Sequence, residues 1–353
     1  MASSLYDLAR ELVRNGAALL CGASPLSPQL LSIGRSQYQE VRTLGSGGFS
    51  DVVLATDTDT GRQYAIKKML CHDGTDTLDM AQREIAAGQR LQHPNIIPLY
   101  NSEIGEHRDG ARLALLVFPL LGRGTLLDLS LQRAEAGEPL EERFVIELFR
   151  GVCQALQYLH SLQARERDEP DEPSPRQTSG GYESVPQTAL SDMDAGPLVH
   201  GDLKLANVML ADDGRTPVLM DFGSVRGARM HARTRAQALR IQDDAASRSS
   251  MPYRAPELFD VQRDTVFDER TDIWALGCLL FALAYGFTPF EDPRAGPGAS
   301  IALAAVNARF DAPDPDPYSP RLMQLARFIL VSDPQQRPFI DQVIAMTDSL
   351  YPS

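Results

Sequence analysis

The sequence has 353 residues and 43% hydrophobic content, enough to bury a substantial core in one large domain or two lobes. Its 34 basic and 47 acidic residues give a formal net charge of -13, which repels nucleic acid, so we expect no nucleic-acid partner. No apolar run reaches the roughly 18 residues that a membrane-spanning helix needs. The four cysteines lack the CxxC spacing of a metal site and predict unpaired thiols in a reducing, cytoplasmic compartment.

Residues 1–36 are predicted to form an N-terminal extension. Leucines recur at helical spacing between residues 5 and 19, before Cys21 and the turn-rich stretch GASPLSPQ. Two interpretations stand: an amphipathic helix docked on the domain, or a membrane-surface helix with an acylated Cys21. The polar face carries no excess of basic residues, which favours docking. Asp7 and Glu11 disfavour a cleaved signal peptide, whose charges at these positions are positive.

Residues 37–121 predict a small, mainly β lobe with one main helix. The segments YQEVRTLG, DVVLATDT and QYAIKKML are alternating and β-branched, and turns rich in Gly, Asp or Thr separate them. The segment DTLDMAQREIAAGQRLQ predicts the helix, and two further strands follow, the second ending in LALLVF.

Residues 122–353 predict a larger α-helical lobe, so the fold class is expected to be α+β with two lobes. The segment EERFVIELFRGVCQALQYLHSL keeps apolar residues on one face for about six turns. Residues 161–197 are rich in Pro, Ser, Asp and Glu and hold too few apolar side chains to offset the entropy of ordering. We predict a disordered insertion there.

The segment LGSGGFSDVV places a glycine-rich turn between two predicted strands. Gly45, Gly47 and Gly48 have no side chains, so backbone N–H groups can approach a triphosphate closely. Taken alone, the motif also suits a hairpin turn without a ligand. The strand YAIK then ends in Lys67, and Glu84 lies in the predicted helix, where a carboxylate can hold a phosphate-contacting ammonium in position.

Residues 198–224, LVHGDLKLANVMLADDGRTPVLMDFGS, contain a second set of polar groups. Asp202 lies on a loop between strand-like runs, as a carboxylate able to accept or orient a hydroxyl proton. Lys204 can neutralise charge on a transferred phosphoryl group, while Asn207 and Asp221 offer hard oxygen ligands suited to Mg2+. Together with Lys67 they predict a phosphoryl-transfer site around a metal-bound nucleotide between two lobes.

These motifs resemble those of eukaryotic protein kinases. GSGGFSDV, YAIK, Glu84, HGDLKLAN, DFG, YRAPE, DIWALG and DPQQRP occur in the family's order and cover residues 38–352 apart from the insertion. CHDGTDTLDMAQREI, GRGTL and FDERTDIWALGCLLFAL are most similar to the Numb-associated kinase family, and within it to the branch of the myristoylated and palmitoylated serine/threonine kinase. The opening Met-Ala-Ser-Ser lacks the glycine that myristoylation requires, so Cys21 is the acylation candidate.

The resemblance implies a serine/threonine protein kinase that uses ATP and Mg2+, with dual specificity left open. Asp202 would be the catalytic base and Lys204 would contact the γ-phosphate. Lys67, held by Glu84, would contact the α- and β-phosphates. The implied magnesium ligands are Asn207 and Asp221.

The resemblance also implies the residues around the nucleotide. Val52, Ala65 and Met209 would enclose the adenine, with Phe118 as gatekeeper and residues 119–122 as the hinge. The implied nucleotide-binding set is Leu44, Gly45, Ser46, Gly47, Gly48, Phe49, Val52, Ala65, Lys67, Phe118, Pro119, Leu120, Leu121 and Met209. Outside it, Glu257 should pair with Arg337, Asp272 should brace the catalytic loop, and Ser250 should present a hydroxyl to Asp202 and Lys204.

Two positions depart from the family pattern. Ser50 replaces the third glycine of the phosphate loop. Gly201 replaces the arginine that commonly receives a phosphate on the activation segment. We therefore predict an enzyme that does not depend on that phosphoswitch. Its activation segment would be ordered by the packing of a helix over RAQALRIQDDAAS, residues 235–247.

Two other functions fit part of the pattern. HGDL followed by Asn is also similar to small-molecule phosphotransferases of the aminoglycoside and choline type, but these lack the Ala255-Pro256-Glu257 segment and its arginine partner. A pseudokinase scaffold is the second alternative, although every charged catalytic position is filled. The expected partners are proteins with Ser or Thr hydroxyls. Membrane association through the N-terminal helix and Cys21, on Golgi, vacuolar or other internal membranes, is left open, as is the oligomeric state.

Overall fold

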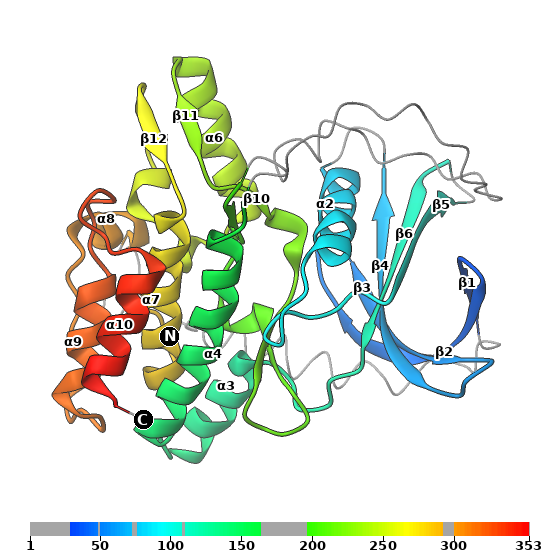
Figure 1. Cartoon of the computed structure of the whole chain (residues 1–353), viewed down its shortest axis with the longest axis horizontal. Helices are drawn as coiled ribbons and strands as arrows, with labels where there is room; N and C mark the ends of the chain where they lie inside the picture. The colour runs from blue at the N-terminus through cyan, green and yellow to red at the C-terminus, as the bar shows by residue number, and fades with distance from the viewer. Residues whose placement is uncertain are drawn as a thin grey trace, which may run out of the picture. The chain divides into compact units, whose positions relative to one another are not determined.

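The computed structural model describes residues 29–48, 50–72, 76–107, 110–163, 196–291 and 300–352 (Figure 1). These residues divide into two compact units. Unit 1 holds the described residues of 29–81 and 98–120, and unit 2 holds those of 82–97, 121–291 and 300–352. The predicted N-terminal helix with Cys21, Phe49 of the glycine loop, and residues 164–195 of the predicted insertion lie outside the described residues.

The described residues of unit 1 form a six-stranded antiparallel sheet, which confirms the predicted β-rich lobe. The strand order across the sheet is β1-β2-β3-β4-β6-β5. The strands are β1 (Leu30–Ile33), β2 (Ser36–Ser46), β3 (Asp51–Asp57), β4 (Gln63–Cys71), β5 (Asn101–Glu106) and β6 (Arg112–Pro119). The predicted helix is α2 (Thr77–Arg90), which lies between β4 and β5 along the chain.

Strand β1 corrects the sequence analysis, which placed its residues in the N-terminal extension. It pairs with β2 through a tight turn at Gly34, whose φ is 60°. Leu31 and Ile33 are 4% and 0% exposed and pack in the sheet's core. Two alternating apolar residues beside a turn-rich stretch give no strand signal, because tertiary burial rather than local pattern defines such a short strand.

The two faces of the sheet carry different residues. One face builds the core cluster, to which β3 contributes Val53 and Ala55 and β4 contributes Ile66. Successive side chains of a strand point to opposite faces, so Val52 and Lys67 project from the other face. The register confirms this arrangement, because Val52 pairs with Lys67, and Ala65 pairs with Phe118. Val52, Ala65, Lys67 and Phe118 thus share the face opposite the core cluster of unit 1.

Unit 2 is mainly helical, as predicted. Its helices are α3 (Leu126–Ala136), α4 (Glu142–His160), α6 (Arg235–Arg248), α7 (Arg270–Tyr285), α8 (Ile301–Asn307), α9 (Pro320–Ile329) and α10 (Ile340–Leu350). Short strands pair in three antiparallel ladders: β7 (Leu198–Val199) with β10 (Arg226–Gly227), β8 (Val208–Leu210) with β9 (Pro217–Leu219), and β11 (Met230–Ala232) with β12 (Thr265–Phe267). None of the described helices is long and apolar enough to cross a bilayer.

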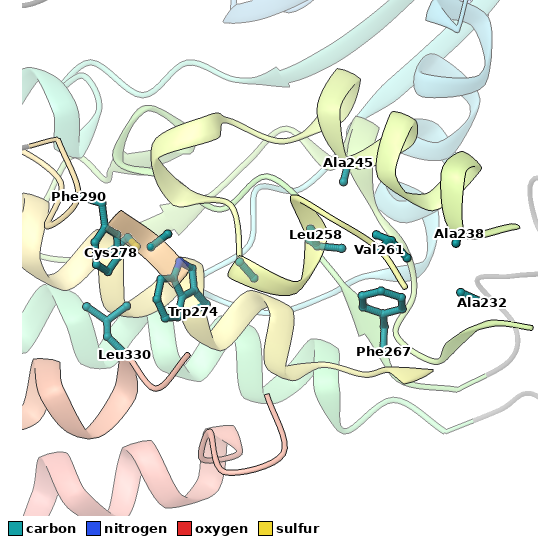
Figure 2. Packing of buried hydrophobic residues seen from close by; sticks show 12 residues of the cluster. Ala232, Ala238, Ala245, Leu258, Val261, Phe267, Trp274, Cys278, Phe290 and Leu330 are labelled. Atoms are coloured by element: carbon teal, nitrogen blue, oxygen red, sulfur yellow. The ribbon is translucent and has the colours of Figure 1, made fainter. Parts of the chain in front are cut away.

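Helix α7 forms the centre of unit 2, and residues 271–284 of it are all buried. Figure 2 shows Trp274 and Cys278 of this helix in one apolar cluster with Ala238 and Ala245 of α6. The Trp274 ring stacks on Phe290 with centroids 5.1 Å apart. The cluster runs continuously from α7 to the face of α6, so α6 shares the core of the unit.

Three of the four cysteines, Cys71, Cys153 and Cys278, lie among the described residues and are buried free thiols. Burial raises the pKa of all three. A buried thiol with a raised pKa is poorly reactive, because the thiolate is the nucleophilic form. These three residues therefore contribute to packing.

Gly151 in α4 provides a test of close packing. A Cβ at this position would lie 2.4 Å from Cγ of Pro217 in β9, whose ring cannot rotate away. We expect Gly151→Ala to lower the melting temperature, because overpacking of about 1–3 kcal/mol exceeds the gain in helix propensity of about 1 kcal/mol. Gly105→Ala is the control: nothing lies within 4 Å of its added Cβ. Equal melting temperatures for both variants, measured by scanning calorimetry, would contradict this packing argument.

Candidate active site

The carboxylate of Asp202 accepts hydrogen bonds from three donors. Its Oδ1 accepts from the Ser250 backbone N–H at 2.8 Å, and its Oδ2 accepts from Lys204 Nζ at 2.7 Å. Asn207 Nδ2 donates to the same Oδ2 at 3.2 Å and to the Asp202 backbone oxygen at 2.8 Å. Lys204 Nζ also donates to the Ser250 hydroxyl at 2.9 Å. The structure therefore brings together four residues that the sequence singled out, and holds the carboxylate from both of its oxygens.

The loop that carries Asp202 is held from α7 by the buried carboxylate of Asp272. This carboxylate accepts from the backbone N–H groups of His200 at 2.7 Å and Gly201 at 3.1 Å. The His160 Nε2 atom lies 3.4 Å from its Oδ2. Burial alone would raise the pKa of Asp272, but the hydrogen bonds and the neighbouring histidines hold that pKa below its usual value. The predicted bracing contact of Asp272 is present.

His200 connects the Asp202 loop to the segment that carries Asp221. Its Nδ1 accepts from the Asp202 backbone N–H at 3.3 Å, so the ring proton is assigned to Nε2. Nε2 then donates to the Met220 carbonyl at 3.0 Å. The ring also packs edge-on against Phe222, with centroids 5.2 Å apart. One buried imidazole thereby fixes two functional segments relative to each other.

Asn207 and Asp221, the predicted magnesium ligands, come close through Met220. The Met220 N–H donates to the Asn207 backbone oxygen at 2.9 Å, one residue before Asp221. The Asn207 amide nitrogen is engaged with Asp202, which leaves its Oδ1 to meet a cation. Asp221 has a left-handed backbone with φ of 64°, a conformation that is uncommon for non-glycine residues and is often found at functional sites. An amide oxygen and a carboxylate are hard donors, so this pair fits Mg2+.

The predicted nucleotide residues of unit 1 lie on strands β2, β3, β4 and β6 and in the loop that follows β2. Leu44, Gly45 and Ser46 end β2, and the loop then turns so that the Gly47 N–H donates to the Ser50 carbonyl at 2.8 Å. Phe49 lies outside the described residues. A Cβ at Gly45 or Gly48 would meet nothing within 4 Å, so these glycines are not required by packing within the loop itself. Their absent side chains leave the backbone accessible, as a phosphate-binding loop requires.

The remaining nucleotide residues are divided between the units. Phe118 and Pro119 end β6, Leu120 is the last residue of that stretch of unit 1, and Leu121 begins the second stretch of unit 2. Met209 lies in β8 of unit 2, where it pairs with Val218. Lys67 belongs to unit 1 and Glu84 to unit 2. The Lys67–Glu84 pair, and the convergence of Lys67 with Asp202, Asn207 and Asp221, stay predictions.

Gly201 has a backbone conformation that favours glycine. Its φ is 82°, and a Cβ there would lie 2.7 Å from the backbone oxygen of Ser224. The sequence showed only that an arginine was missing. The structure shows that the loop approaches Ser224 too closely for a side chain at this position without a shift of the backbone.

The helix predicted over 235–247 is present as α6. The Thr234 hydroxyl accepts from the Gln237 N–H, and the Gln237 side chain accepts from the Thr234 N–H, which completes a capping box at its start. Ala238 and Ala245 are buried in the cluster of Figure 2. The activation segment is therefore ordered by apolar packing, as predicted.

Glu257 and Arg337 form the expected structural pair. Two guanidinium nitrogens of Arg337 donate to the two carboxylate oxygens, each at 2.9 Å. The Arg337 side chain is 0% exposed, and its guanidinium lies 5.1 Å from the Trp274 ring centroid. A bidentate buried pair fixes orientation as well as distance, so the segment after α6 is anchored to the core of unit 2.

Two residues with a role in this arrangement were given none by the sequence analysis. Arg254 donates to the Ser249 hydroxyl and carbonyl, both at 2.9 Å, and to the Ala246 carbonyl at 3.3 Å. It thus places a cation at the C-terminal end of α6, where the helix dipole favours positive charge. The Ser224 hydroxyl donates to the Arg248 carbonyl at 2.9 Å. Both residues lie inside recognised motifs, YRAPE and DFGS, but a motif does not reveal which distant carbonyl a side chain meets.

Comparisons with known proteins place these residues in context. The family described as "Protein kinase domain" matches residues 38–168 and 188–347. The chain is 36% identical over 320 residues to serine/threonine-protein kinase 16 of Rattus norvegicus, covering 91% of this chain and 92% of that protein. It is 30% identical to serine/threonine-protein kinase ppk13 of Schizosaccharomyces pombe over 90% of this chain and 92% of that protein. It is 27% identical to serine/threonine-protein kinase ENV7 of Saccharomyces cerevisiae over 98% and 100%.

The Asp272 contacts lead to a pH-dependent prediction. Asp272→Asn places the side-chain amide N–H against a backbone N–H of His200 or Gly201. We therefore expect the free energy of unfolding to fall by about 1–3 kcal/mol, and kcat to fall as well. Because the folded pKa of Asp272 lies below the unfolded value of about 3.9, its contribution is present above that pH and is lost as the pH falls towards the folded pKa.

The measurement is the melting temperature of both proteins between about pH 7 and pH 2. The gap between wild type and Asp272→Asn should be widest at neutral pH and narrow below about pH 4. Asp264→Asn serves as control, because that side chain is exposed and pairs only with the neighbouring Arg263 among the described residues. A gap that stays constant across the pH range would contradict the assignment.

Proposed function

This chain belongs to the protein kinase family, and we propose that it transfers the γ-phosphate of Mg-ATP to serine and threonine hydroxyls of proteins. The α+β fold and the family predicted from the motifs are confirmed. The observation that carries the proposal is the Asp202 carboxylate, held by Lys204, Asn207 and the Ser250 N–H. An acid fixed in this way, beside a cation and an amide oxygen, suits the transfer of phosphate to a hydroxyl.

In the proposed reaction, Asp202 orients the substrate hydroxyl and accepts its proton. Its fixed carboxylate loses little freedom on substrate binding, so orientation supplies part of the rate enhancement. Lys204 donates to Asp202 and Ser250 in this structure, and in the reaction it would neutralise charge on the transferred group. Asn207 and Asp221 would hold the magnesium ion, which supplies charge neutralisation at the phosphates when bound.

The nucleotide would contact residues of both units. In unit 1 we assign Val52 and Ala65 to the adenine and Lys67 to the α- and β-phosphates, with the glycine loop over the phosphates. Their placement on one sheet face, opposite the core cluster, supports this assignment. In unit 2 we assign Met209 to contact the adenine. We assign Glu84 the role of holding the Lys67 ammonium in place. The hinge would follow Phe118, where Pro119, Leu120 and Leu121 pass between the units.

Protein hydroxyls are the substrate class that best suits the segment after α6. Small-molecule phosphotransferases lack the Ala255-Pro256-Glu257 segment, which here is anchored by Arg337. That segment follows Ser250, whose hydroxyl accepts from Lys204 beside Asp202. Lys204, two residues after the proposed base, favours Ser and Thr over Tyr in the family pattern.

Attachment to internal membranes is a further part of the proposal. An acyl chain on Cys21 and an amphipathic helix before it would supply the attachment. These residues lie outside the described residues, so the support comes from the helical spacing of leucines in the sequence. One acyl chain gives only marginal, reversible binding, which suits a peripheral enzyme.

Replacement of Asp202 tests the catalytic role. We expect Asp202→Asn to lower kcat by about 10²–10⁴-fold with little change in KM for ATP, because the carboxylate acts on the substrate hydroxyl. The measurement is transfer of labelled phosphate from ATP to a Ser/Thr peptide library. Asp260→Asn, an exposed carboxylate of the same unit, should match wild type. Equal transfer by wild type and Asp202→Asn would rule out intrinsic catalysis.

Gly201 and α6 together support independence from an activation-segment phosphate. The helix is ordered by its capping box and buried alanines, contacts that need no phosphate. We expect protein treated with a broad-specificity phosphatase to keep its kcat within about twofold, because no ordering charge is removed. Mass spectrometry should verify the removal of phosphate. A loss of activity that returns on rephosphorylation would show that a phosphoswitch operates here.

A further inference from the structure

A basic pocket in unit 2 has no part in the proposed reaction. Its volume is about 260 Å³, and the described residues that line it include four arginines and one aspartate. Arg83 comes from α2, Arg226 from β10, Arg229 from the turn after β10, and Arg248 from the last turn of α6. The aspartate is Asp244, one helical turn before Arg248. These five side chains leave three positive charges in excess, so the pocket favours an anion.

The guanidinium of Arg226 is destabilised by its surroundings. Burial lowers the pKa of its guanidinium, the carboxylates of Asp272 and Asp244 oppose that change, and Arg83 and Arg248 add to it. Among the described residues, its hydrogen-bond partner is the weak acceptor Sδ of Met230 at 3.5 Å. A partly buried cation beside like charges favours an anion close by, because the loss of its hydration is otherwise uncompensated.

Asp244 supplies an anion from within the chain. Its Oδ1 lies 2.8 Å from Arg248 Nε, and the Arg248 side chain is only 15% exposed, while that of Asp244 is 43% exposed. Both residues line the pocket, and the aspartate is the more exposed of the two. The Coulomb attraction in this pair is less screened than on the open surface, because its arginine is largely removed from water.

Arg248 links this ion pair to the active site. Its backbone carbonyl accepts from the Ser224 hydroxyl at 2.9 Å, next to the Asp-Phe-Gly segment. Two residues further along, the Ser250 N–H donates to Asp202 Oδ1 at 2.8 Å. A displacement of the last turn of α6 would therefore move a hydrogen-bond donor of the proposed catalytic carboxylate, and displacements of about 1 Å can cost 100-fold in rate.

We propose that the four arginines form an anion site whose resident occupant is the Asp244 carboxylate, and that Asp244 positions Asp202 through Arg248 and Ser250. The carboxylate then performs the ordering that a phosphate on the activation segment performs through arginines in phosphorylation-dependent enzymes. This inference rests on the proposed function. It assigns Asp244 a positioning role, since the side chain reaches the reacting groups only through other residues.

The test compares Asp244→Asn with Asp243→Asn, a neighbouring exposed carboxylate outside the pocket lining. We expect Asp244→Asn to lower kcat by roughly tenfold with KM for ATP nearly unchanged, because Asp202 is displaced while the nucleotide contacts remain. Asp243→Asn should match wild type. Asp244→Glu should keep most of the activity, because it retains the charge.

Inorganic phosphate distinguishes an anion site from a merely structural contact. At constant ionic strength, phosphate in place of chloride should raise both kcat and the melting temperature of Asp244→Asn, since the anion enters the emptied site. The same exchange should leave Asp243→Asn unchanged. The melting temperature also reports whether Asp244→Asn is folded, and if it is not, recovery of its folded state on addition of phosphate carries the comparison.

Two outcomes would overturn the inference: wild-type kcat in Asp244→Asn, or a loss of activity that neither Asp244→Glu nor phosphate reverses. Wild type and Asp202→Asn are assayed in the same series. If wild type transfers no phosphate at all, the proposed function fails, and the phosphate-dependent melting temperature of Asp244→Asn alone decides whether the anion site exists.

Discussion

The buried carboxylate of Asp272 is the constraint on which the site in unit 2 depends. It lies in α7, the most buried helix of the unit, and accepts from two consecutive N–H groups at His200 and Gly201. Two donors on one carboxylate fix the direction of the loop as well as its position. Asp202 follows immediately, so the orientation of its side chain derives from a residue 70 positions further along the chain.

A second constraint acts on Asp202 from the activation segment. The Ser250 N–H and the Lys204 ammonium contact different oxygens of its carboxylate. The position of Ser250 depends on α6, which is held by buried alanines on one side and, in our proposal, by the anion site on the other. The apolar packing is insensitive to salt, whereas charge interactions are screened by it. In our proposal, the charged pocket sets the alignment of the last turn of α6.

Arg226 places a guanidinium near the loop in which Gly201 replaces the usual arginine. Gly201 has a positive φ and faces the Ser224 carbonyl, so a side chain there is unfavourable. Arg226 comes from β10, which pairs with the strand just before His200, and it lines a small cavity together with Gly201, Asp202 and Asp272. A guanidinium is thus present near the loop although the arginine of the usual motif is absent. Because Arg226 lies on β10, it also lines the pocket that contains Asp244.

The sequence by itself determined the fold class, the family and the identity of the polar groups around Asp202. Their spacing along the chain repeats a family pattern. Helical periodicity predicted α4, which carries a clear apolar face, and the absence of Gly and Pro predicted α6. The Glu257–Arg337 pair and the Asp272 contact were also predictable, because they belong to those motifs.

Only the tertiary structure decided the remaining features. Strand β1 exists because the sheet buries Leu31 and Ile33, which four residues of sequence cannot indicate. The anion site combines Arg83, Arg226 and Arg248, which are separated by up to 165 positions, and no local pattern marks arginines that meet only after folding. Charge interactions depend on distance in space and on burial, and both are properties of the folded chain.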